Sequence, residues 1–200
     1  MTRILGIPEK DAGLLERFAY RFSRRRFGKI PEPMRATAHH RRVLLGVGAM
    51  ELALARSDLV DARLKKLAEM KVALVVGCEF CADIGSMLGK ELGITDDQLR
   101  ALPRYRNSAA FSPLEKLVLE YAVGMTGTPA TIPDRLFGEL RGCFDEAQLV
   151  ELTAAIAWEN HRARFNHALG MGYGGFSKGS YCPFAGDSEE GRIPRMEVHE

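Results

Sequence analysis

The segment 63–92, RLKKLAEMKVALVVGCEFCADIGSMLGKEL, constrains the fold of this chain more than any other part of it. Apolar residues recur at three- and four-residue steps on both sides of Gly77, which predicts two helices joined by a tight turn. Cys78 and Cys81 follow that turn, where unpaired backbone N–H groups and the positive end of a helix dipole favour a thiolate. The second cysteine lies about one helical turn along, close enough for a disulfide. The pair therefore predicts redox chemistry.

The remainder of the chain shows the same helical periodicity, and no segment alternates strictly enough to predict a strand. We therefore expect an all-α fold, a single-domain multi-helix bundle. The expected helices, in residue numbers, are 11–27, 34–55, 59–76, 82–92, a short one from 95, 112–125, 131–142 and 146–169. Ser57 or Asp58 is the expected N-terminal cap of the helix before the cysteines, and Asp83 is the expected cap of the helix after them.

The composition favours one globular domain and argues against a nucleic-acid footprint. Two hundred residues, 46% of them hydrophobic and 27% charged, can bury a core without disulfides. A net charge of +2 is too small to indicate a nucleic-acid partner. The densest basic cluster, residues 21–29, is interpreted as a solvated or inter-subunit helix face, with an anion or a membrane surface as the alternative contact.

No segment has the pattern of a signal peptide or a membrane span, so we expect a soluble, cytoplasmic protein with no membrane partner. Cytosolic thiols are kept reduced, which favours catalysis or metal binding over a static disulfide for the CxxC pair. Because the chain has one such pair and no second pair of ligands at zinc-finger spacing, we expect no metal and no cofactor. Cys143 and Cys182 stand alone, and no role is assigned to them.

The order helix, GCEFC, helix, then SPLEKLVLEYA and AAIAWENHRARFNHALG resembles the carboxymuconolactone decarboxylase superfamily, including its alkylhydroperoxidase D-like branch. The resemblance covers residues 34–170 and leaves an N-terminal helical extension, 1–33, and a Gly-rich irregular tail, 171–200. It implies an all-helical homo-oligomer, a trimer, hexamer or dimer, whose partner is a small-molecule peroxide or a protein disulfide. By analogy, Cys81 reacts with the peroxide and Cys78 is its resolving partner.

The same resemblance identifies what this chain lacks. The family has a Glu twelve residues before the first cysteine and a His four residues after the second, and Lys66 and Gly85 occupy these positions. The residue before the second cysteine, a His in the best-characterised family members, is Phe80. Both thiols are kept, but the family's proton relay is missing. Positive charge on Lys66 or Lys71 is an alternative means of lowering the thiol pKa.

Other residues are candidates for the missing proton transfer. Glu69 lies one turn beyond Lys66 and is interpreted either as a carboxylate that reaches the CxxC turn or as an exposed or ion-paired helix residue. In the last helix, His161 or His167 is a candidate proton carrier, because a histidine titrates near neutral pH. The alternative interpretation of that helix is a polar network over residues 159–164 that supports a subunit interface.

The sequence therefore predicts a CxxC thiol–disulfide oxidoreductase that reduces peroxides or disulfides. The predicted catalytic residues are Cys78, Cys81, Glu69 and His161. Two alternatives stay open. One is a lyase acting on a small carboxylate or lactone, although members of the decarboxylase branch generally lack the CxxC pair. The other is a non-enzymatic helical oligomer whose thiols sense the redox state.

Overall fold

The computed structural model describes residues 2–178 and 181–182, and within these residues it contains helices and no strand. The all-α prediction is confirmed. Two short 3-10 helices, η1 (Glu9–Asp11) and η2 (Leu102–Asn107), accompany the α-helices. The α-helices are α1 (Leu14–Phe27), α2 (Glu32–Thr37), α3 (Arg41–Arg56), α4 (Ala62–Val76), α5 (Glu79–Glu91), α6 (Asp96–Ala101), α7 (Pro113–Thr126), α8 (Asp134–Arg141) and α9 (Glu146–Ala168).

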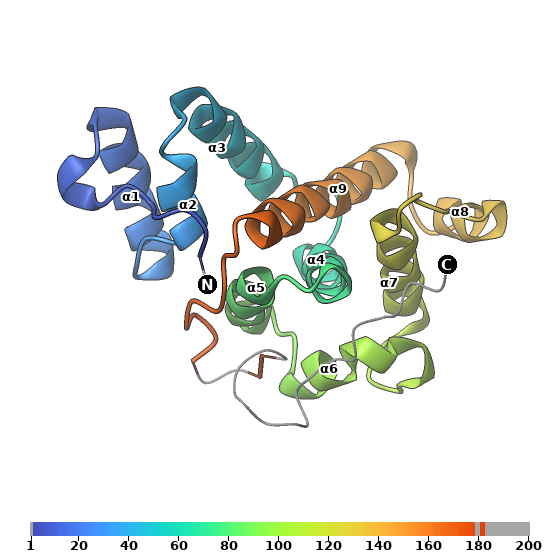
Figure 1. The fold of residues 1–200 in the computed structure, drawn as a ribbon. Coiled ribbons are helices and arrows are strands. Elements are labelled where there is room, and N and C mark those ends of the chain that lie inside the picture. Colours follow the sequence, from blue (N-terminus) through green and yellow to red (C-terminus); the bar gives the residue numbers. More distant parts are fainter. Residues whose placement is uncertain (1, 179–180, 183–200) are drawn as a thin grey trace.

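Helix α4 is the centre of the fold, with α5, α7 and α9 packed around it (Figure 1). Leu67, Ala68 and Val72 of this helix are fully buried. Its buried residues also include Lys65 and Lys71, so neighbouring elements cover α4 on several sides. The cysteines that follow α4 therefore begin inside the protein.

Two hydrophobic clusters lie on different sides of α4. One joins Val72 and Leu64 to α7, α8 and the first half of α9. The other joins Leu67 and Met70 to α5, α6 and the segment after α9, and it contains both residues of the CxxC pair. The pair is therefore part of a packed core and does not project from the surface.

The predicted helix 34–55 is wrong, because the chain breaks between α2 and α3. His40 has an extended backbone, with φ −131° and ψ 97°, and caps α3. Its ring Nδ1 accepts a hydrogen bond from the backbone N–H of Val43 at 3.3 Å. The ring thus supplies a partner for one of the N–H groups that a helix start leaves unpaired.

Helix starts were predicted correctly where the capping signal is strong. Ser112 and Asp145 cap α7 and α9, and each forms a capping box with the third helical residue. The predicted cap of α4 at Ser57 or Asp58 is wrong, because Asp61 takes that place and accepts from the N–H of Leu64 at 2.9 Å. The first helix begins at Leu14, since the residues before it form η1.

The apolar stripe that predicts α1 is not the face that α1 buries. Leu14, Phe18 and Phe22 are 87%, 73% and 59% exposed. The buried face carries Glu16 and Tyr20, and the Tyr20 hydroxyl donates to the carbonyl of Ile7 at 2.8 Å. Contacts with the preceding chain therefore orient α1, and its apolar stripe faces outward.

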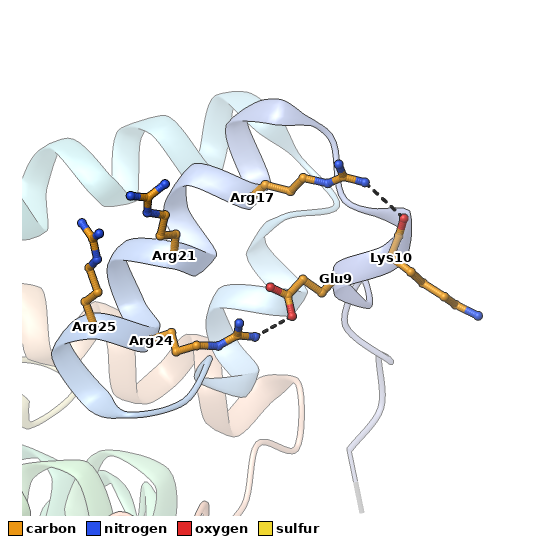
Figure 2. A pocket seen from close by; sticks show the side chains of 6 residues that line it. All are labelled: Glu9, Lys10, Arg17, Arg21, Arg24 and Arg25. Atoms are coloured by element: carbon orange, nitrogen blue, oxygen red, sulfur yellow. Dashed lines mark hydrogen bonds and ion pairs between the residues drawn. The ribbon is translucent and has the colours of Figure 1, made fainter.

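Basic residues of α1 line an open hollow of about 870 Å³ beside η1 (Figure 2). Arg24 pairs with Glu9 at 2.5 Å, and Arg17 donates to the carbonyl of Lys10 at 3.5 Å. Arg21 and Arg25, on the same face of α1, complete the lining (Figure 2). None of the described helices is both long enough and apolar enough to cross a membrane.

Candidate functional site: a buried disulfide under an asparagine

Cys78 and Cys81 form a disulfide at the start of α5, with their Cα atoms 5.3 Å apart. Gly77 ends α4 in the left-handed region, with φ +77°, a conformation that other residues rarely adopt. Cys78 then caps α5, and its Sγ accepts from the N–H of Cys81 at 3.2 Å. The predicted helix 82–92 starts three residues earlier than expected, so Cys81 lies within the first turn.

The side-chain amide of Asn166, on α9, is the polar group that reaches both sulfur atoms. Its Nδ2 lies 3.4 Å from the Sγ of Cys81 and 3.9 Å from that of Cys78, in a buried position. Hydrogen-bond donors at a sulfur favour the thiolate over the thiol. Asn166 was not among the site residues predicted from the sequence. No local signal in the sequence indicates this contact, because Asn166 lies 85 positions from Cys81.

Apolar side chains cover the disulfide. Cys78 is 2% exposed and Cys81 is 7% exposed. Phe80, between them in the sequence, is buried against the ring of Phe176, with ring centroids 5.7 Å apart and planes at 83°. Met171 belongs to the same cluster. A reactant must therefore reach the sulfurs through an apolar surface.

Asp83 does not cap α5, contrary to the prediction, because Cys78 takes that place and Asp83 is the fifth residue of the helix. The Asp83 carboxylate is fully buried and accepts from the chain after α9. The donors are the backbone N–H groups of Gly174 at 2.9 Å, Phe176 at 3.0 Å and Ser177 at 2.8 Å. Asp83 therefore binds a segment about ninety positions away in the sequence.

Glu69 lies in a cluster of charged side chains between α4, α9 and α3. It pairs with Lys66 and, at 3.2 Å, with Arg162. Arg162 also lies 2.9 Å from Glu159 and 3.4 Å from Glu51. Burial alone would raise the pKa of Glu69, but the charges of Lys66 and Arg162 outweigh it and lower that pKa. The interpretation of Glu69 as an ion-paired residue fits this geometry.

The pKa of Glu159, in the same cluster, shifts in the opposite direction. Burial raises the pKa of Glu159 to about 7, against the opposing charge of Arg162. Glu69, already ionised beside the same guanidinium, adds to that rise. Two carboxyl groups whose environments drive their pKa values apart are typical of sites that hold one proton and one charge. Near neutral pH, Glu69 is therefore charged while Glu159 retains much of its proton.

The structure does not bring Glu69 or His161 into hydrogen-bonding contact with the sulfurs. His161 is exposed and stacks on the ring of Trp158, with centroids 4.5 Å apart. It is five residues from Asn166, which places it roughly 140° around α9 from the residue that meets the disulfide. A role for His161 at the disulfide stays a prediction. Within one chain, the face of α9 that carries His161 points away from the disulfide.

Two further candidates also point elsewhere. The ammonium group of Lys71 donates to the carbonyl of Leu102 at 3.3 Å and lies 4.8 Å from the centre of the Tyr105 ring. His167 is exposed near the end of α9. Of the cysteines outside the pair, Cys143 is exposed and Cys182 is buried.

Comparison with known proteins finds a family match over the part of the chain that contains the cysteine pair. Residues 42–123, from α3 into α7, match the carboxymuconolactone decarboxylase family. The chain is similar to that family over these residues. They lie within the predicted domain 34–170, whose exact bounds stay a prediction. The alignment with the uncharacterized protein YnjA of Escherichia coli K12 is 42% identical over 114 residues, which are 57% of this chain and 62% of YnjA. The chain thus spans less than two thirds of that relative's length.

Solved structures share the fold of this chain. The debrominase Bmp8 superimposes with a TM-score of 0.78 at 19% identity, over 90% of this chain and 96% of Bmp8. An alkylhydroperoxidase AhpD core protein of Ralstonia eutropha JMP134, described as peroxidase-related, superimposes with a TM-score of 0.76 at 15% identity, over 86% of this chain and 92% of its own. The predicted AhpD-like helical fold is confirmed. The activities named in this family and its fold neighbours, decarboxylase, debrominase and peroxidase-related, are enzymatic.

Proposed function

We propose that this carboxymuconolactone decarboxylase family protein is a CxxC thiol–disulfide oxidoreductase acting on low-molecular-weight disulfides and peroxides. The observation that carries the proposal is the contact of the Asn166 amide with both sulfurs of the Cys78–Cys81 pair. A structural disulfide needs no donor at its sulfurs. A pair that alternates between disulfide and thiolate gains from one, because the donor stabilises the charged state.

In the reduced state Cys81 is the attacking thiol and Cys78 is the resolving thiol. Cys81 is the more exposed of the two, and its sulfur is the closer one to Asn166. With a disulfide RSSR, the Cys81 thiolate attacks one sulfur and releases RS⁻. The Cys78 thiolate then attacks the Cys81 sulfur and releases the second RS⁻, so the substrate gains the two electrons that the cysteine pair loses. A separate reductant restores the two thiols.

A peroxide places a further demand on the site. Attack on ROOH gives a Cys81 sulfenic acid and ROH, and Cys78 then closes the disulfide and releases water. The leaving alkoxide needs a proton, whereas a leaving thiolate does not. Among the described residues, the hydrogen bonds to the sulfurs come from Asn166 and the Cys81 N–H, and neither donor is an acid. We therefore expect faster reaction with small disulfides than with alkyl hydroperoxides.

The test is the loss of free thiols when reduced protein meets a panel of oxidants: a small aromatic disulfide, cumene hydroperoxide and hydrogen peroxide. We expect wild type to lose two thiols per disulfide consumed. Cys78→Ser should stop at a mixed disulfide on Cys81, and Cys81→Ser should react slowly. The Cys78→Ser/Cys81→Ser double variant keeps Cys143 and Cys182, so it measures their background. If wild type consumes the oxidants no faster than this double variant, the proposed enzymatic function is rejected.

A reductive dehalogenase is a second candidate. The fold neighbour Bmp8 is a debrominase, and one of its cysteine-to-alanine variants was crystallised with 2,3,4-tribromopyrrole. The apolar cover of the disulfide here, Phe80 with Phe176, favours an apolar aromatic reactant. The balanced reaction converts Ar–Br and two thiols into Ar–H, a disulfide, Br⁻ and H⁺. Release of bromide from tribromopyrrole, matched to thiol loss, would select this candidate over the first.

The same oxidant panel distinguishes a thiol enzyme from a lyase and from a redox sensor. A lyase acting on a lactone or small carboxylate would retain activity in the double cysteine variant, since its reaction consumes no thiols. A redox sensor would oxidise once and show no turnover when a thiol reductant is supplied in excess. Multiple turnovers that require both cysteines would exclude the lyase and the sensor.

A further inference from the structure

We propose that residues 171–178, here called the strap, close the Cys78–Cys81 pair to macromolecular partners, and that Asp83 is the positioning residue that holds the strap shut. Small molecules are then the reactant class of the pair. That last clause rests on the proposed function, whereas the closure itself is a property of the fold. Figure 1 shows the chain after α9 running past α5.

The attachment to Asp83 is the first line of support. Three backbone N–H groups of the strap converge on one buried carboxylate, as described above. Hydrogen bonds to a charged acceptor are stronger than those between neutral groups, and a buried carboxylate left without them would be strongly unfavourable. Asp83 lies two residues after Cys81, so the attachment point and the reactive pair belong to the same turns of α5.

The second line of support is the packing of Phe176. Its ring meets Phe80 edge-on and lies 6.4 Å from the ring centre of Phe27, with planes at 86°. Lys29 lies 4.0 Å from the Phe176 ring centre and donates to the carbonyls of Gly174 and Gly175. The strap is thus fastened on one side by α5 and on the other by the residues that follow α1.

The start of the strap is tied to the residue that contacts the sulfurs. The N–H of Met171 donates to the backbone carbonyl of Asn166 at 2.9 Å. Gly174 is required next to Phe176, because a Cβ atom there would lie 2.7 Å from the Phe176 ring. Gly175 has φ +70°, which favours glycine. The strap therefore follows a path that its glycines permit and that ends in contact with the CxxC turn.

The consequence is a size limit. Thiol–disulfide exchange requires the attacking sulfur to approach the target sulfur directly. With Cys78 and Cys81 almost fully buried, a cysteine on the surface of another protein cannot make that approach while the strap is closed. A small, apolar molecule has no such restriction once local motions admit it.

The experiment compares alkylation of the reduced protein by N-ethylmaleimide and by a maleimide carried on a polyethylene glycol chain of several kilodaltons. Peptide mapping follows loss of the unmodified Cys78–Cys81 peptide and of the Cys143 peptide, and exposed Cys143 is the internal reference. The variants are Asp83→Asn and Phe176→Ala. The control is Asp61→Ala, which removes the side-chain cap of α4 and touches no residue of the strap.

In wild type, we expect the large reagent to modify the pair at least about tenfold more slowly than the small one, after both rates are normalised to Cys143. Asp83→Asn and Phe176→Ala should each raise the rate of the large reagent at the pair by about tenfold, since each removes a contact that holds the strap. Asp61→Ala should destabilise the protein and yet leave the ratio of the two alkylation rates as in wild type, which separates strap opening from general destabilisation.

Two results would overturn the proposal. The quantity compared is the ratio of the alkylation rate with the small maleimide to that with the large one. The first result is a wild-type ratio at the pair equal to the ratio at Cys143. The second is a ratio at the pair that neither Asp83→Asn nor Phe176→Ala changes. Alkylation needs no oxidant and no turnover, so these outcomes do not depend on the oxidoreductase test. The reactant class is tested separately with reduced variants. Asp83→Asn and Phe176→Ala should gain rate toward a protein disulfide relative to a small disulfide, and equal gains with both would contradict the size limit.

Discussion

The thioether sulfur of Met70 lies 2.9 Å from the point that a Cβ atom on Gly85 would occupy. Both residues are buried, one on α4 and the other on α5. Gly85 is the position at which the family resemblance places a histidine of the proton relay. Because Met70 fills the space beside Gly85, a histidine there would require Met70 to move. A histidine at position 85 therefore does not fit the present packing of α4 against α5.

This packing predicts that Gly85 and Met70 are energetically coupled. Gly85→Ala should reduce the free energy of unfolding by about 1–3 kcal/mol through overpacking. Met70→Ala should reduce it by about 2–5 kcal/mol through the cavity it leaves. The loss in the double variant should be smaller than the sum of the two single losses by about 1 kcal/mol or more. Removal of the Met70 side chain makes room for the new Cβ, and that Cβ in turn fills part of the cavity. Urea unfolding of the four proteins measures this cycle, and strict additivity would show that Met70 does not restrict position 85.

Asn166 should control the reactivity of the reduced cysteines. Asn166→Ala removes the donor at the sulfurs, so thiolate formation should need a higher pH. We expect the pH of half-maximal alkylation of the pair to rise by about one unit, and oxidant consumption at pH 7 to fall about tenfold. Asn160→Ala is the matched control, since Asn160 lies on the same helix and donates to Thr126. Equal effects of the two variants would assign Asn166 a structural role only.

Glu159 should make the protein less stable as the pH rises. Its pKa is about 7 in the folded protein against 4.5 in the unfolded chain, so between these values the folded protein binds the extra proton. Stability from this group is therefore present at low pH and is lost as the pH passes through 7. Between pH 5 and pH 8, the free energy of unfolding of Glu159→Gln should therefore rise by about 1–3 kcal/mol relative to that of wild type.

Thermal and urea unfolding at the two pH values measure the Glu159 effect. Glu146→Gln is the control, because the Glu146 side chain is 93% exposed. A difference between Glu159→Gln and wild type that is the same at pH 5 and pH 8 would contradict the raised pKa. Glu51 and Glu69 share Arg162 with Glu159, so both stay unchanged in this comparison.

Lys71 should have the opposite pH dependence. Burial first, and then the charge of Arg106, lowers the pKa of Lys71 from 10.5 to about 8. Between these pH values the unfolded chain holds the proton that the folded protein has released, so stability rises with pH. Lys71→Met should be more stable than wild type at pH 7 by about 1–2 kcal/mol, and this advantage should shrink by pH 10. Lys10→Met, at the protein surface, should show no such trend, and an advantage that does not change with pH would refute the lowered pKa.

Local signals account for what the sequence predicted well. The capping residues Ser112 and Asp145 act on N–H groups within the next turn, so their position in the sequence is sufficient to locate the helix starts. The same holds for Gly77, whose left-handed backbone ends α4 directly before Cys78. His40 shows the limit of this reasoning, since it breaks the predicted helix 34–55 through a ring nitrogen that is not a common cap.

The sequence by itself determined the all-helical fold and the position of the cysteine pair at a helix start, because each depends on residues within a few positions of one another. Only the tertiary structure decided which groups meet that pair. Asn166 reaches Cys78 across 88 positions, and Asp83 reaches Phe176 across 93. A side chain's spacing gives its direction from its own helix but does not identify the helix opposite. The packing of α9 and the strap against α5 decided which residues contact the cysteine pair and Asp83. Burial of apolar surface sets the arrangement of the helices, and the buried polar groups then form hydrogen bonds within it.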